Sequence, residues 1–329
     1  MAIFDVGDAR KLRSAVSRAV ERASQPGLSE EERRLMLRMV VVGGGPTGVE
    51  FTGELSDYLN DALLRLYPQL APLAQVVLIH GRESLLPGFD EGLQAKALQS
   101  LVEQRVEVRL STRVSRVASP SSLTLARQGE EEDLSCSFIV WAGGTGPHKL
   151  TSRLREQLNV SSDSNGRLPV DPWLRVRGSP PGSLFAMGDA SLCISEEGEP
   201  LPQTAQVAAQ QGAYVARLLN LPYDLTVSEG PWSSQAANGE LGAMLLTRGA
   251  TTARPFEFLN LGILAYVGGG EALSQVQLGE KKLLMEAGST GFLLWRSVYV
   301  VKQVSPRTRF LVLFDWLKTR IFGRDVAGF

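Results

Sequence analysis

The stretch Met39–Leu55, MVVVGGGPTGVEFTGEL, decides the fold of this chain. It opens with Met39–Val42, a short apolar run rich in β-branched residues, which is typical of a buried parallel strand. The spacing Gly-x-Gly-x-x-Gly follows at once, and behind it apolar residues recur at helical intervals. Strand, glycine-rich turn and helix in this order predict a dinucleotide-binding βαβ unit, because the start of such a helix offers unpaired N–H groups to a pyrophosphate.

The three glycines of this spacing have separate expected roles. Gly43 permits the tight turn, Gly45 lets the backbone approach a pyrophosphate, and Gly48 lets helix and strand pack closely. The spacing alone is weak evidence, since glycine-rich turns occur by chance, and it is the strand before and the helix after that favour a nucleotide site.

Composition bounds the alternatives. The chain has 329 residues, 43% of them hydrophobic, which is enough for two packed domains. Its net charge is −1, so we expect no nucleic acid partner. Two cysteines and two histidines are too few and too scattered to predict a disulfide framework or a metal site. No apolar window of about 18 residues, the length that predicts a transmembrane helix, occurs in the chain.

The residues after the glycine-rich turn continue a Rossmann-type pattern to about residue 147. Further apolar runs predict strands at Val76–His80, Val106–Leu110 and Phe138–Trp141, with a helix over Asp90–Val102. Before the last of these strands we expect a small antiparallel excursion, with strands Val114–Val117, Ser122–Leu125 and Leu134–Ser137 around the polar loop Gln128–Asp133.

A different pattern follows. The segment Ser183–Ala190, SLFAMGDA, predicts a strand that ends in Gly188-Asp189, followed by a loop and a helix over Thr204–Asn220. At the carboxyl end of a strand, Asp189 is placed to accept hydrogen bonds from ligand hydroxyls. Gly-Asp is also a common turn, so the pair alone does not decide between the two readings.

The C-terminal part changes again. Phe258–Tyr266 and Gln275–Gln277 are predicted strands, and from Thr290 the chain carries apolar and aromatic clusters with a basic rim. That combination suits helices lying in a membrane interface, while a packed terminal helical pair or an oligomer contact remains the alternative. One helical face gathers Phe310, Leu313, Phe314, Leu317 and Ile321.

Five motifs in this order carry a family resemblance: VVVGGGPTGVEFTGEL, IVWAGG, LFAMGD, LPQTAQVAAQQG and FLLWRSVYVVKQVSPRTRFLVLFDWLKTRIFGRD. The sequence resembles the type II (alternative) NADH:quinone oxidoreductases, most of all the mitochondrial-type enzymes of fungi, plants and algae. The resemblance implies a flavoprotein that passes a hydride from NADH or NADPH to FAD, and then two electrons to a quinone, without pumping protons. It also implies a peripheral place on the mitochondrial inner membrane, with a plastid membrane as the alternative.

The fold class implied is α/β, with a Rossmann-type NAD(P)-binding domain, the remnant of a second (FAD) dinucleotide-binding domain, and a C-terminal sheet with amphipathic helices. We expect four parts: a helical lead-in at 1–39, the NAD(P)H-binding domain at 40–147, the C-terminal part of the FAD-binding domain at 148–225, and the sheet and membrane-surface helices at 226–329. Residues 290–329 are the expected membrane contact.

The resemblance also assigns site residues. Glu50 corresponds to a glutamate near the nicotinamide–flavin stack, although an acid in the first helical turn would also be stabilised by the helix dipole. Gln206 and Gln210 match the family's AQxxxQ segment near the flavin ring and the quinone. These three are the expected catalytic residues, and the expected cofactor-binding residues are Gly43, Gly45, Gly48, His80, Arg82, Ala142, Gly143, Gly144, Gly188, Asp189, Thr204 and Ala205.

Two local departures from the family pattern are expected to matter. The acidic residue that binds the adenosine ribose at the end of the second strand is replaced by His80, and Arg82 lies close by. We therefore predict that NADPH is accepted at least as well as NADH, since the repulsion of a 2′-phosphate is weakened and Arg82 can pair with it. In the family's Ala-Thr-Gly segment, Gly143 replaces the threonine, so one hydroxyl contact is missing.

A larger departure concerns the flavin site. Family members carry a separate N-terminal FAD-binding GxGxxG unit, and the spacing occurs once in this sequence. We expect the chain to be the C-terminal portion of such an enzyme, with a homodimer or a partner chain covering the missing flavin half. The alternative function is a non-catalytic nucleotide-binding or structural subunit of a membrane complex, derived from such an enzyme.

Overall fold

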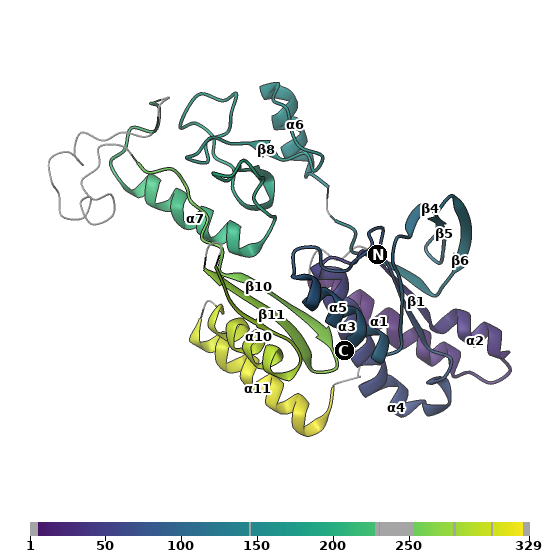
Figure 1. Cartoon of the computed structure of the whole chain (residues 1–329). Coiled ribbons are helices and arrows are strands. Elements are labelled where there is room, and N and C mark those ends of the chain that lie inside the picture. The colour runs from purple at the N-terminus through teal and green to yellow at the C-terminus, as the bar shows by residue number, and fades with distance from the viewer. Residues whose placement is uncertain are drawn as a thin grey trace. The chain divides into compact units, whose positions relative to one another are not determined.

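The chain forms two compact units in the computed structural model, which describes residues 6–144, 146–227, 230, 253–278, 281–303 and 305–324. Unit 1 comprises residues 1–144 together with 260–329, and unit 2 comprises 145–259 (Figure 1). The predicted lead-in and nearly all of the predicted Rossmann domain share unit 1 with residues 260–329, whereas residues 226–259 of the predicted C-terminal region belong to unit 2.

Unit 1 is built around a parallel sheet of four strands in the order β3-β2-β1-β7. Met39 lies opposite Val76 on one side and Phe138 on the other, so β1 is central and the sequence crosses over to reach β7. A parallel sheet with helical crossovers confirms the predicted α/β class. In the order of the sheet, the strands span Val106–Arg109, Gln75–Ile79, Arg38–Val42 and Phe138–Trp141.

The apolar run of β1 is buried on both faces. Met39 and Val41 belong to the core that the helices cover, whereas Val40 and Val42 pack with a second, smaller cluster below an antiparallel sheet. This two-sided burial explains why β1 is uniformly apolar rather than alternating. The helices on the first face are α1 (Val6–Ala23), α2 (Glu30–Leu37), α3 (Pro46–Tyr58) with its continuation α4 (Leu64–Leu66), and α5 (Glu91–Glu103).

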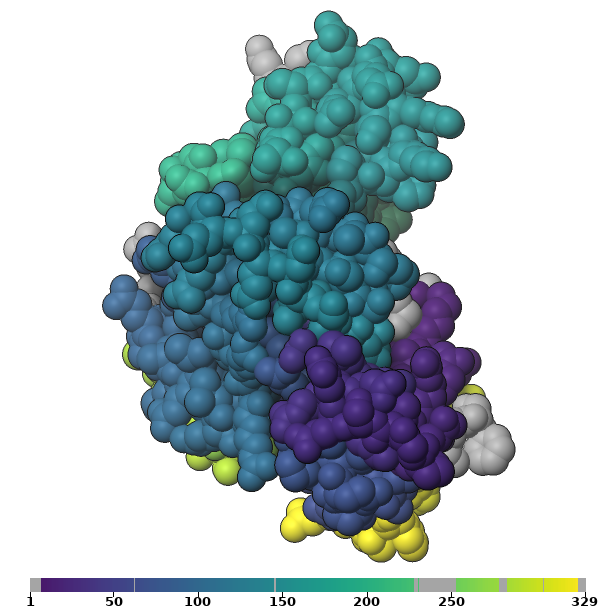
Figure 2. All heavy atoms as spheres, turned by 90° about the vertical axis from the view of Figure 1, so that its right-hand side faces the viewer, coloured from purple at the N-terminus to yellow at the C-terminus, as the bar shows by residue number. Residues whose placement is uncertain are grey.

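The N-terminal segment forms two helices, α1 and α2. Ser29 caps α2 by accepting a hydrogen bond from the backbone N–H of Glu32, whose carboxylate reaches back to the N–H of Ser29. The apolar stripe of α1 lies in the main core, and Ser17 of α1 contacts the Tyr58 hydroxyl at 3.0 Å. Figure 2 shows these helices, in purple, packed against the neighbouring blue segments of the unit.

The antiparallel excursion forms as predicted, with one correction. The segment predicted as the polar loop Gln128–Asp133 contributes most of a strand, because Glu130–Ser135 pairs with its neighbour along its whole length. Only Leu134 of this strand is buried, so an edge strand that is wet on both faces carries the composition of a loop. The three strands are β4 (Arg113–Ser119), β5 (Ser122–Arg127) and β6 (Glu130–Ser135).

The C-terminal region adds an antiparallel sheet to α3. Its strands are β10 (Gly262–Gly268), β11 (Glu271–Leu278) and β12 (Lys281–Glu286), so the first strand begins later than predicted, and β12 was not predicted. The backbones of α3 and β10 touch, since a Cβ on Gly53 would lie 2.5 Å from the nitrogen of Gly268. Two helices follow, α10 (Ser289–Val301) and α11 (Pro306–Phe322).

Buried polar groups fasten this junction. Asp57 of α3 accepts hydrogen bonds from the Tyr266 hydroxyl and, at 2.9 Å, from the backbone N–H of Gly269. Arg324, beyond α11, forms ion pairs with Asp57 at 3.6 Å and with Glu54. Burial and the Asp57 carboxylate raise the pKa of Tyr266, which keeps its hydroxyl a donor. Within the described ranges, no helix is both long and apolar enough to cross a membrane.

Among the residues of unit 2 that the structure describes, the longest regular element is α7 (Ala205–Asn220), which confirms the predicted helix. The strand predicted over Ser183–Ala190 does not form: Phe185 makes a single bridge to Arg175, and Gly188–Ala190 is one 3₁₀ turn. Buried arginine–aspartate pairs take the place of sheet pairing, with Arg175 holding Asp171 at 2.6 Å. The remaining elements are α6 (Lys149–Leu158), β8 (Leu168–Pro169) and β9 (Ser191–Leu192).

Candidate functional site

Three predicted segments meet at one edge of the sheet of unit 1. The glycine-rich turn follows β1, His80 follows β2 and Ala142 follows β7, and the carboxyl ends of adjacent parallel strands lie side by side. The backbone N–H of Gly43 donates to the carbonyl of Ile79 at 2.8 Å, and that of Ala142 donates to Val42 at 2.7 Å. The sheet order reverses between β1 and β7, which is where open α/β sheets bind their ligands.

The three glycines of the turn differ in what surrounds them. Gly43 has φ +118°, and a Cβ there would lie 2.3 Å from the carbonyl oxygen of Ala142; a Cβ on Gly48 would lie 1.7 Å from the carbonyl oxygen of Gly43. A Cβ on Gly45 would meet nothing within 4 Å. Gly43 and Gly48 are therefore required by packing, while Gly45 leaves open space beside the start of α3.

The start of α3 fits an anionic group. Gly45 is its N-cap and provides no side-chain cap, and Pro46 is the first helical residue. The first-turn N–H groups of a helix have no intrahelical acceptor, so they carry partial positive charge toward this space. A phosphate approaching Gly45 would receive these hydrogen bonds, which is the arrangement that binds dinucleotide pyrophosphates.

His80 points back to the turn rather than outward to a ribose. Its Nδ1 accepts a hydrogen bond from the backbone N–H of Gly44 at 3.0 Å, which requires the neutral ring with its proton on Nε2. Burial, with a smaller contribution from Arg82, lowers the pKa of His80 and favours that neutral form. Its Nε2 is buried and has no hydrogen-bond partner among the residues described. At the sequence position where the family pattern has a ribose-binding residue, His80 instead stabilises the glycine-rich turn.

Arg82 and Glu83, two and three residues after His80, are both exposed. The stem of Arg113 lies against Gly81, since a Cβ there would approach its Cγ to 3.1 Å. On the other side of the turn, Ala142 contacts Gly43, whereas Gly143 and Gly144 are exposed. A Cβ on Gly143 would lie 3.2 Å from the ring of Trp141, so a larger residue there would require a small shift of that exposed side chain.

Glu50 connects α3 to the C-terminal sheet. Its carboxylate accepts a hydrogen bond from the backbone N–H of Tyr266 at 3.1 Å. Burial raises its pKa, opposed by hydrogen bonds from Tyr266 and the Trp295 side chain. Glu50 lies beyond the first turn of α3, so the alternative of an acid held by the helix dipole is wrong. A half-buried carboxyl whose pKa is raised by burial holds its proton more readily than an exposed one.

The expected residues of unit 2 gather around the start of α7. Thr204 caps the helix by accepting a hydrogen bond from the backbone N–H of Val207, and Ala205 is its first, exposed residue. Asp189 is exposed in the 3₁₀ turn. The backbone N–H of Gly188, which has φ +62°, donates to the side-chain oxygen of Gln211 at 2.6 Å and is therefore not available to a ligand.

Gln206, Gln210 and Gln211 have three different environments. Gln206 is half-buried, and no hydrogen bond of its side chain is found among the described residues. The amide of Gln210 is engaged at both ends by the backbone of Leu259, at 2.8 and 3.0 Å. Gln211, which the sequence reasoning missed, is fully buried and fixes the turn at Gly188. Its signal was its phase, four residues from the buried Val207 and Val215 on the apolar face of α7.

Comparison with known families decides the identity. A family model described as pyridine nucleotide-disulphide oxidoreductase matches residues 4–212, more than half of the chain. The chain belongs to this family. A second model, the NDH2 C-terminal domain, matches residues 260–325 and places it among the type II NADH dehydrogenases. The resemblance drawn from the five motifs is thereby confirmed.

Curated relatives match along nearly the whole chain. It is 32% identical to a probable mitochondrial NADH-ubiquinone oxidoreductase of Schizosaccharomyces pombe, covering 98% of this chain and 60% of that protein. It is 34% identical to the mitochondrial internal alternative NAD(P)H-ubiquinone oxidoreductase A1 of Solanum tuberosum, again with 98% and 60% covered. The chain thus spans about 60% of the length of these relatives.

The fold agrees with a solved structure of the family. NDH2 from Plasmodium falciparum, solved in complex with NADH, superposes with a TM-score of 0.82 over 99% of this chain and 74% of that one, at 22% identity. At that identity the likeness concerns the fold, and it supports both the parallel sheet of unit 1 and the sheet and helices that follow it.

Proposed function

We propose that this chain is the NAD(P)H-binding and quinone-reducing portion of a type II NAD(P)H:quinone oxidoreductase that pumps no protons. The observation that carries the proposal is the open space at Gly45, beside an uncapped helix start and at the point where the sheet order reverses. The names of the relatives as oxidoreductases favour this enzyme over a non-catalytic subunit. Their names also support a place at the mitochondrial inner membrane, as a peripheral protein.

In this proposal the turn Gly43–Gly48 holds the pyrophosphate of the nicotinamide nucleotide through the N–H groups at the start of α3. Glu50 is the nearest titratable group on the same helix that is tied to the C-terminal sheet, and its raised pKa suits a group that holds a proton during reduction of a quinone. FAD, if bound, would supply a hydride acceptor and a source of two electrons for the quinone.

Fewer residues are proposed to contact the flavin than the sequence motifs suggested. Asp189 offers an exposed carboxylate to ribityl hydroxyls, and Gly188 contributes a left-handed turn rather than its N–H group. Gln206 is the amide offered to the flavin ring or the quinone, while Gln210 holds the segment at Leu259. Gln211 is fully buried beside this turn and fixes Gly188 through its side-chain oxygen rather than contacting a ligand.

The choice of nucleotide follows from the direction of His80. His80, at the end of the second strand, is turned to Gly44 and offers no carboxylate to a ribose, and the exposed Arg82 would pair with a 2′-phosphate. We therefore propose that NADPH is accepted at least comparably to NADH, with Glu83 as the one nearby carboxylate that opposes it.

Membrane attachment is proposed for residues 290–329. The outer face of α11 exposes Phe310 and Phe314 at 67% and 55%, and that of α10 exposes Leu293 at 67%. Basic residues surround these side chains, which suits a helix pair lying in the interface of an anionic membrane. A homodimer or a partner chain would cover the same apolar surface, and the sedimentation experiment described in the Discussion separates these occupants.

The proposal is tested with the 329-residue chain by calorimetric titration with NADH and NADPH and by assay of quinone reduction. We expect nucleotide binding by the chain alone, and no steady turnover until the N-terminal flavin-binding half of a relative is supplied, since the GxGxxG spacing occurs once in these residues. Failure to bind either nucleotide would refute the assignment of Gly43–Gly48. Steady turnover by the chain alone would refute the expected need for a second glycine-rich unit.

A further inference from the structure

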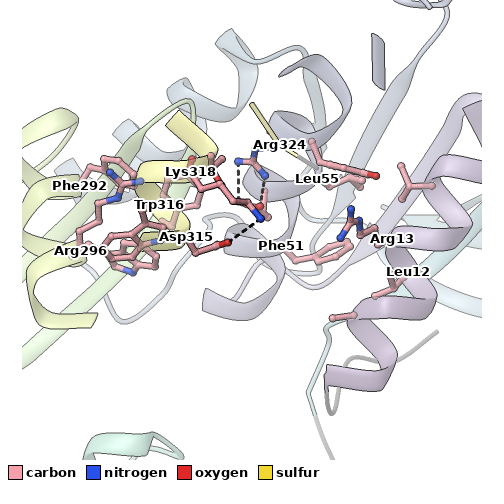
Figure 3. A pocket seen from close by; sticks show the side chains of 17 residues that line it. Leu12, Arg13, Phe51, Leu55, Phe292, Arg296, Asp315, Trp316, Lys318 and Arg324 are labelled. Carbon is pink, nitrogen blue, oxygen red and sulfur yellow. Dashed lines mark hydrogen bonds and ion pairs between the residues drawn. The ribbon is translucent and has the colours of Figure 1, made fainter. Parts of the chain in front are cut away.

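Unit 1 contains a cavity of about 630 Å³ that the proposed reaction does not use. Its walls come from α1, α3, α10 and α11, so it lies between the N-terminal helix and the C-terminal helix pair (Figure 3). One wall is apolar, with Leu12 and Phe51, and the opposite wall is aromatic, with Phe292, Trp295 and Trp316.

The charges that line this cavity are unbalanced. Three of the lining cations, Arg296, Lys318 and Arg324, lie with two lining carboxylates, those of Glu54 and Asp315. Both carboxylates have partners already, since Glu54 pairs with Arg324, and Asp315 lies 4.0 Å from Lys318 (Figure 3). Arg296 makes no ion pair with any of the residues that the structure describes. The cavity therefore presents a cation that has no counter-ion.

Arg296 is held in place by aromatic rings. Its guanidinium carbon lies 4.6 Å from the ring centre of Phe292 and 4.5 Å from that of Trp316. Its Nε is buried and has no hydrogen-bond partner in the part of the chain that the structure describes. Two rings fix the plane of the guanidinium without using its N–H groups, and a buried N–H that lacks an acceptor is costly. Phosphate oxygens in the cavity would supply acceptors to a guanidinium that has no ion-pair partner among the described residues, and planar guanidinium groups match phosphate oxygens.

The position of the cavity beside the proposed membrane contact indicates which kind of anion it would bind. Both helices that carry its aromatic wall also carry the exposed apolar residues of the proposed membrane contact, including Leu293 and Phe310. We propose that this cavity binds the phosphate group of an anionic phospholipid, with the N–H groups of Arg296 as donors and the acyl chains along the exposed apolar face of α10 and α11. This inference rests on the proposed membrane attachment and names the lipid chemistry that it uses.

The first test measures partition of the chain onto vesicles of phosphatidylcholine, with and without phosphatidylglycerol. We expect phosphatidylglycerol to strengthen binding and Arg296→Gln to reduce that gain by about tenfold, the loss typical of one charge-assisted contact. The matched control is Arg307→Gln, an exposed arginine of α11 outside the cavity, which should retain most of the gain. Equal losses in both variants would overturn the proposal in favour of unspecific attraction.

A second test separates the cavity from the membrane. Dodecyl phosphate, inorganic phosphate and a short-chain ubiquinone are titrated while the fluorescence of Trp295 and Trp316 is followed. We expect saturation by dodecyl phosphate, at least about tenfold weaker binding in Arg296→Gln, and little response to inorganic phosphate, which lacks the chain. Tighter binding of the neutral quinone, unaffected by Arg296→Gln, would assign the cavity to a quinone instead.

These arms distinguish the two proposals. Loss of all vesicle binding, with dodecyl phosphate binding intact, would refute membrane attachment and keep the anion site; vesicle binding without a dodecyl phosphate site would do the reverse. Thermal unfolding verifies that Arg296→Gln folds. If it does not, Arg296→Lys keeps the charge and loses the flat contact with Phe292 and Trp316, and we expect it to bind dodecyl phosphate more weakly than the wild type.

Discussion

The Nδ1 atom of His80 accepts a hydrogen bond from the backbone N–H of Gly44 at 3.0 Å, which ties the end of β2 to the turn that follows β1. The bond exists only while the ring is neutral, because a protonated imidazole has no acceptor. The shape of the turn beside Gly45 therefore depends on the ionisation of His80, which stands at the sequence position where the family pattern has a ribose-binding acid.

The first prediction concerns pH. Burial lowers the pKa of His80 in the folded chain below its ordinary value of 6.5, so the folded state binds fewer protons than the unfolded one. The contribution of the neutral ring to stability is complete above pH 6.5, and it is lost as the pH falls through the lowered folded pKa. Calorimetric unfolding between pH 8 and pH 5 should show this loss in the wild type. It should be smaller in His80→Asn, whose amide oxygen accepts without titrating; parallel profiles would contradict the prediction.

The second prediction separates two glycines. Gly45→Ala adds a Cβ into open space, so the free energy of unfolding should change by less than about 0.5 kcal/mol. Affinity for NADH should fall, because the methyl group blocks the phosphate. Gly48→Ala drives a Cβ to 1.7 Å from the Gly43 carbonyl and should destabilise unit 1 by several times as much. Calorimetry and nucleotide titration on the same two proteins check both statements. Equal behaviour of the two variants would show that Gly45 has no binding role.

The third prediction concerns the 2′-phosphate. Arg82→Ala should weaken NADPH by about tenfold and leave NADH unchanged, since one charge-assisted contact to phosphate is removed. Arg116→Ala, another exposed arginine of the same unit, serves as the control and should affect neither nucleotide. A preference for NADH over NADPH in the wild type by a hundredfold would defeat the underlying proposal, and an equal effect on both nucleotides would move Arg82 away from the 2′-position.

The fourth prediction concerns the membrane face. The double variant Phe310→Ser, Phe314→Ser should release the chain from liposomes, since each buried phenyl ring contributes roughly 1.5–3 kcal/mol. Both rings are exposed, so the fold should be unaffected, whereas deletion of 290–329 would also remove the contact of Gly291 with Ala272. Sedimentation with liposomes and size-exclusion chromatography are run together. Release of a dimer to a monomer without any change in liposome binding would assign these rings to an interface between chains.

Local patterns made the centre of unit 1 predictable. Burial on both faces makes β1 uniformly apolar, and the lack of room for a Cβ in the turn requires glycine at positions 43 and 48. The local pattern within Met39–Leu55 is therefore sufficient to predict the strand, the turn and the helix. The edge strand Glu130–Ser135 escaped because only Leu134 is buried in it, and polarity does not separate such a strand from a loop. The two-residue strands of unit 2 are too short for any periodicity.

The sequence predicted which residues lie at the candidate site better than it predicted where their side chains point. Spacing placed His80 beside the glycine-rich turn, but the ring's turn toward Gly44 depends on how β2 meets β1. Gln210 matched a motif, yet its amide is engaged by Leu259, 49 residues away. The link from Glu50 to Tyr266 joins residues 216 apart in sequence, and no local pattern carries a contact of that length.

The backbone contact between Gly53 and Gly268 also has a consequence for the order in which the protein is made. The face of α3 that carries Gly53 and Asp57 is covered by β10, whose Ala265 and Val267 complete the core around Val41. On the ribosome, all of unit 2 is synthesised before those strands exist. The nucleotide-binding half must therefore remain unfinished, with that apolar helix face open, until more than a hundred further residues have been added after residue 144.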